Sequence, residues 1–90
     1  MTLQEFIDKK ITKEEQQEIR YIDASNKNIT SLENNGNLIN LKQLEIAHNN
    51  ELKSLKGIEL IPNLEIISIY NNKLEDISHL KYLKYLNYIN

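Results

Sequence analysis

The chain has 90 residues, a formal net charge of −2 and no cysteine. This length predicts one small domain, and without cysteine neither a disulfide nor a thiolate metal site can stabilise it. The weak acidic charge gives no long-range attraction for nucleic acid or for an anionic membrane. No basic segment followed by a long apolar stretch opens the chain, and no apolar run approaches the ~18 residues of a membrane span. The sequence therefore predicts a soluble, cytoplasmic protein.

Residues 1–18 carry two helix-start signals. Thr2 with Glu5 has the form of a capping box, so we expect a helix to start at Leu3. Thr12 with Glu15 repeats the signal for a second short helix that runs to about Glu18. The apolar stripe of the first segment predicts an N-terminal helical cap over 1–18 that covers the next part of the core; it consists of Leu3, Phe6, Ile7 and Ile11.

From residue 19 onward the chain repeats itself. The stretches 19–24, 41–46 and 64–69 each read apolar-x-x-apolar-x-apolar, and 86–89 begins a fourth copy, with starts 22 or 23 residues apart. A period in the twenties is typical of solenoid folds, in which each coil covers its neighbours. We therefore expect residues 19–90 to form about three and a half repeats, continuous with the helical segment as one domain.

Within each repeat the apolar spacing changes from two to three. The first part predicts a short strand with two inward side chains per repeat: Ile22 and Ala24, Leu44 and Ile46, Ile67 and Ile69. The return path then has an apolar residue at every third position, which predicts a 3-10 or extended segment against the core. These positions are Leu52, Leu55, Ile58 and Ile61 in the second repeat and Leu74, Ile77, Leu80 and Leu83 in the third. The first repeat gives Ile29, Leu32, Asn35 and Leu38, so only Asn35 interrupts the series.

The stretch from Leu64 to Leu74 resembles the pattern L-x-x-L-x-L-x-x-N-x-L of the leucine-rich repeat family, and the repeat length is similar to the internalin subclass. The resemblance implies an α/β fold: a curved right-handed solenoid with a short parallel sheet on its concave face and 3-10 or extended segments on its convex face. Two departures are visible. Lys27 replaces the turn asparagine found at Asn49 and Asn72, and the second repeat has one extra residue before Leu52, where we expect a bulge.

Members of that family mostly hold another protein against the concave sheet, so the resemblance implies a protein partner. The outward side chains of this chain include three tyrosines and an isoleucine, which suit such a contact. The predicted partner-binding residues are Tyr21, Asp23, Gln43, Glu45, His48, Ile66, Ser68, Tyr70 and Tyr88. The alternative is that they are ordinary strand residues. Asp23 and Glu45 fall side by side on neighbouring strands, where we expect them to repel each other unless a basic group or water intervenes.

The last repeat raises a second hypothesis. The chain as given stops within the fourth strand, and bare strand edges invite pairing with another chain. The sequence predicts that a second copy or a different protein covers an apolar C-terminal edge made of Ile77, Leu80, Leu83, Leu86 and Ile89. The alternative is that the neighbouring tyrosine and lysine side chains shield this edge.

Candidate catalytic groups are few. His48 follows Glu45 by three residues, but no nucleophile or oxyanion donor accompanies this pair, and a solvated histidine is the simpler interpretation. Neither histidine has metal-site spacing, and no glycine-rich phosphate loop is present. The mixed basic and aromatic stretch 81–85 can suit single-stranded nucleic acid, yet its leucine lies in the core series, so we expect no nucleic-acid contact.

These observations predict a non-catalytic protein without cofactors or metal. The first hypothesis is a small adaptor or inhibitor that binds a protein through the concave surface. The second is a structural protein that self-associates, as a homodimer for example, through its C-terminal edge.

Overall fold

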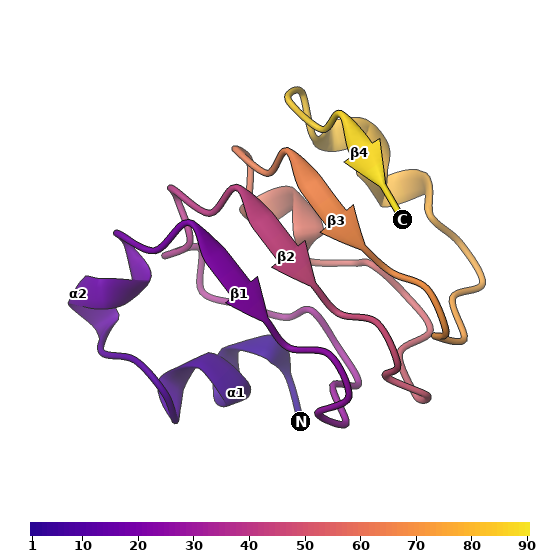
Figure 1. Cartoon of the computed structure of the whole chain (residues 1–90), viewed down its shortest axis with the longest axis horizontal. Coiled ribbons are helices and arrows are strands. Elements are labelled where there is room, and N and C mark those ends of the chain that lie inside the picture. The colour runs from indigo at the N-terminus through magenta and orange to yellow at the C-terminus, as the bar shows by residue number, and fades with distance from the viewer.

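The computed structural model describes residues 1–90, in which four short strands form one parallel sheet in the order β1-β2-β3-β4 (Figure 1). The strands are β1 (Tyr21–Asp23), β2 (Gln43–Glu45), β3 (Ile66–Ser68) and β4 (Tyr88–Ile89). Two 3-10 helices, η1 (Ile58–Leu60) and η2 (Ser78–Tyr82), lie on the return paths that lead to β3 and β4. The strand order equals the chain order, so each repeat lies beside the next.

Two short helices, α1 (Leu3–Asp8) and α2 (Lys13–Gln16), lie at the β1 end of the sheet (Figure 1). Both predicted capping boxes are present: the Thr2 and Thr12 hydroxyls accept hydrogen bonds from the amides of Glu5 and Glu15, whose carboxylates accept from the threonine amides. α1 starts at Leu3 as predicted, whereas α2 ends at Gln16, two residues before the predicted end.

The buried side chain of Gln16 joins the two helices. Its Nε2 donates to Asp8 Oδ1 at 2.8 Å, and its Oε1 accepts from Gln4 Nε2 at 3.0 Å. These amide donors hold the pKa of the Asp8 carboxyl below its ordinary value, because hydrogen bonds to the charged form favour it. Gln16 thereby fixes α2 against α1. The apolar pattern of the sequence did not indicate this contact, because Gln16 is polar and is not part of it.

One hydrophobic core runs from α1 to η2 and contains 19 buried residues, including Leu3, Phe6 and Ile7 of α1. The inward strand positions are buried as predicted, except that Ile69 is only partly buried. At ~1.5–3 kcal/mol for each fully buried aliphatic side chain, this core supplies most of the folding free energy. None of the helices has the length and apolar character needed to cross a bilayer.

The interruption of the first return path lies one residue earlier than predicted. Asn34 is buried and Asn35 is exposed. The Asn34 Nδ2 donates to the carbonyls of Leu32 at 2.9 Å and Gly57 at 3.0 Å, and its Oδ1 accepts from the Gly36 amide. Asn34 is buried because it satisfies backbone groups of two adjacent repeats, a role that Asn35 does not have.

Asn49 and Asn72 occupy the predicted turn position and tie consecutive repeats together. Asn49 Nδ2 donates to the carbonyls of Ala24 and Ile46, and its Oδ1 accepts from the amides of Lys27 and Ile29. Asn72 donates to the carbonyls of Ile46 and Ile69 in the same manner. The first turn therefore tolerates Lys27 because Asn49 of the next repeat satisfies its backbone.

The extra residue of the second repeat is accommodated in a local turn. The Leu52 amide donates to the Asn49 carbonyl at 3.0 Å, and the Leu52 side chain stays fully buried. The return path therefore regains its position against the core, and the insertion does not disturb the following apolar series.

Candidate functional site

The strand register places the predicted outward residues in rows across the sheet. Tyr21 pairs with Gln43, Gln43 with Ile66 and Ile66 with Tyr88, while Asp23, Glu45 and Ser68 form the next row. Backbone bonds from the amides of Asn26 to Ala47 and of His48 to Tyr70 continue this ladder beyond the strand ends. We call this surface the outer sheet face; it comprises Tyr21, Asp23, Ser25, Gln43, Glu45, Ala47, Ile66, Ser68, Tyr70 and Tyr88.

Three tyrosines of the outer sheet face are accessible. The exposed fraction is 50% for Tyr21, 46% for Tyr70 and 56% for Tyr88, and Ile66 between them is partly buried. Tyrosine offers a large contact area at low cost in conformational entropy, because it has only two rotatable side-chain bonds. The outer sheet face therefore offers the surface of its tyrosines to a partner, on a backbone that the hydrogen bonds of the parallel sheet hold in place.

Two positions of the outer sheet face are less accessible than the alternation of strand residues predicts. Ser68 is 7% exposed and Ala47 is 2% exposed. Both side chains are small and lie on the two central strands or just beyond them, where larger neighbours on both sides cover them. Ser68, predicted to contact a partner, therefore lies on the right face but offers almost no surface.

Glu45 is engaged by Tyr21 on the adjacent strand. The Tyr21 hydroxyl donates to Glu45 Oε2 at 2.5 Å, and this bond, with the nearby carboxylates, raises the pKa of Tyr21 to about 12. Asp23 Oδ1 accepts from the Ser25 amide at 3.0 Å. The two carboxylates that the sequence placed side by side thus each accept a hydrogen bond from a different neighbour, which offsets part of their repulsion.

His48 lies on the turn that follows β2. Its imidazole packs edge-on against the Tyr70 ring, with centroids 5.0 Å apart, and its Nδ1 lies 3.2 Å from Asn71 Nδ2. His48 adopts the left-handed backbone region with φ of 59°, as do the equivalent Asn26 and Asn71. Among residues other than glycine, asparagine is one of those that adopt this conformation most readily, so the asparagines at the two equivalent positions were the sequence signal for it. The contacts link His48 to Tyr70 and Asn71, and Glu45 to Tyr21.

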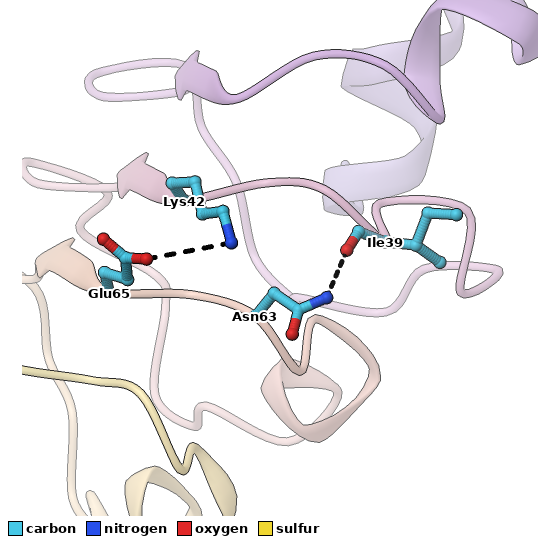
Figure 2. Close-up of polar contacts among 4 residues, drawn as sticks. All are labelled: Ile39, Lys42, Asn63 and Glu65. Carbon is cyan, nitrogen blue, oxygen red and sulfur yellow. Dashed lines mark hydrogen bonds and ion pairs between the residues drawn. The ribbon is translucent and has the colours of Figure 1, made fainter.

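An ion pair and an asparagine contact border the outer sheet face where the strands begin (Figure 2). Lys42 Nζ lies 3.7 Å from Glu65 Oε2, and Asn63 Nδ2 donates to the Ile39 carbonyl at 2.6 Å. Asn40 makes the equivalent bond to the Gln17 carbonyl, one repeat earlier. These contacts fix the segments that lead into β2 and β3, and thereby the positions of the outward side chains.

The predicted C-terminal edge is only partly open. Leu80 and Leu83 are 8% and 6% exposed and belong to the hydrophobic core, as their place in the three-spaced series predicts, so they offer little surface to another chain. Leu86 is partly buried, whereas Ile77 and Ile89 are about half exposed. Coverage of these two residues by another chain stays a prediction.

No cluster of acidic or histidine side chains has the geometry of a metal site. The two surface hollows lie away from the outer sheet face, between α1 and the return paths of the first two repeats. They are polar and open, and their linings share Glu33 and Asn34. The side chains predicted to meet a partner therefore gather on the sheet and not in a cavity.

A comparison with family models matches the middle of the repeat region. Residues 40–82 match the model described as "Leucine Rich repeats (2 copies)". This stretch, slightly less than half of the chain, is similar to leucine-rich repeats. It includes β2, β3 and the intervening return path, and so contains the central half of the outer sheet face. Leucine-rich repeats generally mediate protein–protein interaction. Neither the comparison with curated proteins nor that with solved structures found a match.

Proposed function

We propose that this protein is a small, non-catalytic adaptor or inhibitor that binds another protein on its outer sheet face. The observation that carries the proposal is the exposure of Tyr21, Tyr70 and Tyr88 around Ile66 on one regular surface. Aromatic side chains on a rigid backbone lose little entropy when a partner docks, and they dominate the energetics of many interfaces. The similarity of residues 40–82 to leucine-rich repeats supports the same function.

The scaffold we propose is a short solenoid of the internalin-like kind, with α1 and α2 as its N-terminal cap. Its support is the repeated geometry of strand, turn asparagine and return path, together with the Leu3 and Gln4 amides, which donate to the carbonyls of Ser31 and Glu33. Such a scaffold holds the outer sheet face without needing to reorganise on binding.

The proposal includes no catalytic step. His48 is in contact with Tyr70 and Asn71, and Glu45 accepts a hydrogen bond from Tyr21. Both residues serve as surface contacts in this proposal.

The test is affinity capture with matched surface variants. The double variant Ile66→Ser, Tyr70→Ala removes the centre of the outer sheet face, and the control Tyr82→Ala, Tyr85→Ala removes two tyrosines that are more exposed than Tyr70 from the last return path. Quantitative mass spectrometry should find a protein retained by the wild type and the control but reduced at least about tenfold by the double variant, as expected for interface anchors. Circular dichroism should be the same for all three proteins.

The proposal fails if the double variant retains every protein that the wild type retains. It also fails if the control variant loses the same protein, because the contact would then lie on the return path.

A further inference from the structure

The outer sheet face is divided by chemistry along the strand order. Its β1 and β2 part carries Asp23 and Glu45, the only formal charges of this face. The part on and after β3 and β4 carries Ile66, Tyr70 and Tyr88, which are apolar or aromatic. A partner that covers the whole face therefore meets two carboxylates at one side and an aromatic patch at the other.

The carboxylates have no cation of their own. The single ion pair of the chain joins Lys42 to Glu65, at the border where the strands begin (Figure 2). No lysine or arginine occupies an outward position of the four strands. A partner that buries Asp23 and Glu45 without neutralising them would lose their hydration, so a cationic group on the partner is the favourable complement.

Tyr21 makes the acidic side more selective for such a cation. Its hydroxyl donates to Glu45, which holds the carboxylate beside a ring that is 50% exposed. A lysine or arginine head group can then contact the carboxylates and the ring together, and both contacts are attractive. The same hydrogen bond leaves the second oxygen of the Glu45 carboxylate free of protein partners.

We propose that the partner presents an extended segment whose lysine or arginine side chain binds Asp23 and Glu45 beside Tyr21, while an apolar side chain of the same segment packs on Ile66 and Tyr88. This inference rests on the proposed function and specifies its partner. The two contact areas lie about two strand spacings apart, roughly 10 Å, which an extended chain crosses with about three residues. The recognised segment therefore carries a basic and an apolar residue about three positions apart.

The test uses a random peptide library displayed on phage and selected on the immobilised full chain. We expect enrichment of peptides with a lysine or arginine about three positions from an apolar or aromatic residue. A synthetic peptide from this set should bind about tenfold more weakly to the Asp23→Asn, Glu45→Gln variant, and its affinity for the wild type should fall with added salt. Both substitutions keep the oxygen atoms that accept from the Ser25 amide and the Tyr21 hydroxyl, so the fold should be unaffected.

The matched control is Glu33→Gln, Glu75→Gln, which removes the same charge from exposed positions on the return paths and should leave the affinity unchanged. Peptides that depend on Ile66 and Tyr70 but show no basic residue, or that bind the Asp23→Asn, Glu45→Gln variant as tightly as the wild type, would overturn this inference and leave the proposed function standing. If no selected peptide is sensitive to the Ile66→Ser, Tyr70→Ala change, both are wrong.

Discussion

The Tyr21 side chain connects two neighbouring strands of the outer sheet face. Its hydroxyl crosses from β1 to Glu45 on β2, so the bond joins two adjacent repeats through their side chains. A negative charge on the phenol would lose this bond and repel the carboxylates of Glu45 and Asp23. The neutral phenol is thus favoured in the folded chain, which links the protonation of one surface group to the contact between repeats.

Alkaline titration should show Tyr21 ionising well above the ordinary pKa of a tyrosine. The fold raises its pKa from the ordinary 10.0 to about 12. The stabilising contribution of the neutral phenol is therefore fully present below about pH 10 and is lost as the pH rises through about 12. The tyrosinate absorbance of the wild type, followed against pH, should contain one late component.

Two variants test whether the late component belongs to Tyr21. Tyr21→Phe should remove it, and Glu45→Gln should move it towards the ordinary pKa of 10.0, because the acceptor of the hydrogen bond loses its charge. Tyr85→Phe, at an exposed position on the last return path, should leave it in place. A wild-type curve without the late component would contradict the hydrogen bond between Tyr21 and Glu45.

The buried asparagines show what a repeat pattern can and cannot predict about single residues. Asn49 and Asn72 recur at one position of the pattern, so the sequence indicated their turn role. Asn34 has no counterpart in the other repeats, whereas its neighbour Asn35 fits the spacing of three. The choice between them depends on the Gly57 carbonyl of the next repeat, which Asn34 Nδ2 reaches at 3.0 Å. A contact between irregular segments of two repeats leaves no periodic signal.

The start of η1 lies close to the backbone of the first return path. Gly57 precedes η1 with φ of 105°, and a Cβ atom at this position would lie 2.7 Å from the Leu32 carbonyl oxygen. Gly36 also has a positive φ, of 80°, but a Cβ there would meet nothing within 4 Å. Substitutions at the two glycines therefore distinguish the cost of a left-handed backbone conformation from the cost of a clash between repeats.

Gly57→Ala should lower the free energy of unfolding far more than Gly36→Ala. A side chain in the left-handed region costs about 1–2 kcal/mol, and this is the whole loss expected at Gly36. At Gly57 the clash with backbone adds about 1–3 kcal/mol, since overpacking forces neighbouring segments apart. Urea denaturation of both variants and the wild type measures the difference. Equal losses would mean that η1 does not lie as close to the first return path as described.

The elements themselves were predictable to different degrees. The strands followed from the alternation around Leu44 and Ile67, and their register followed from the repeat, because equivalent residues of stacked coils must pair. The burial of Ser68 and Ala47 did not follow, since it depends on the size of the neighbours and not on the alternation. The burial of Leu80 and Leu83, by contrast, followed from the spacing of three on the return path.

At the scale of the molecule, the core is continuous but uneven along the stack. Leu38, Leu44 and Leu64 in the middle are fully buried, and Leu3 and Ile7 of α1 close the β1 end. Towards β4 the burial declines: Ile69, Leu74 and Leu86 are partly buried, and Ile77 and Ile89 are about half exposed. Since each repeat of a stacked array is stabilised mainly by its neighbours, the last repeat has the least support.

Native-state hydrogen exchange on the 90-residue chain should therefore proceed from the β4 end. The amides of Asn90, bonded to the Ile67 carbonyl, and of Leu83, bonded to the Leu80 carbonyl, should exchange through an opening of η2 and β4 alone. The Ile46 amide, bonded to the Ser68 carbonyl between β2 and β3, should need an opening close to global unfolding. Equal protection of all three amides would mean that the chain unfolds as one cooperative unit. A binding partner that rests on Tyr88 should slow the exchange of Asn90 and leave that of Ile46 nearly unchanged, because it stabilises the repeat that opens first.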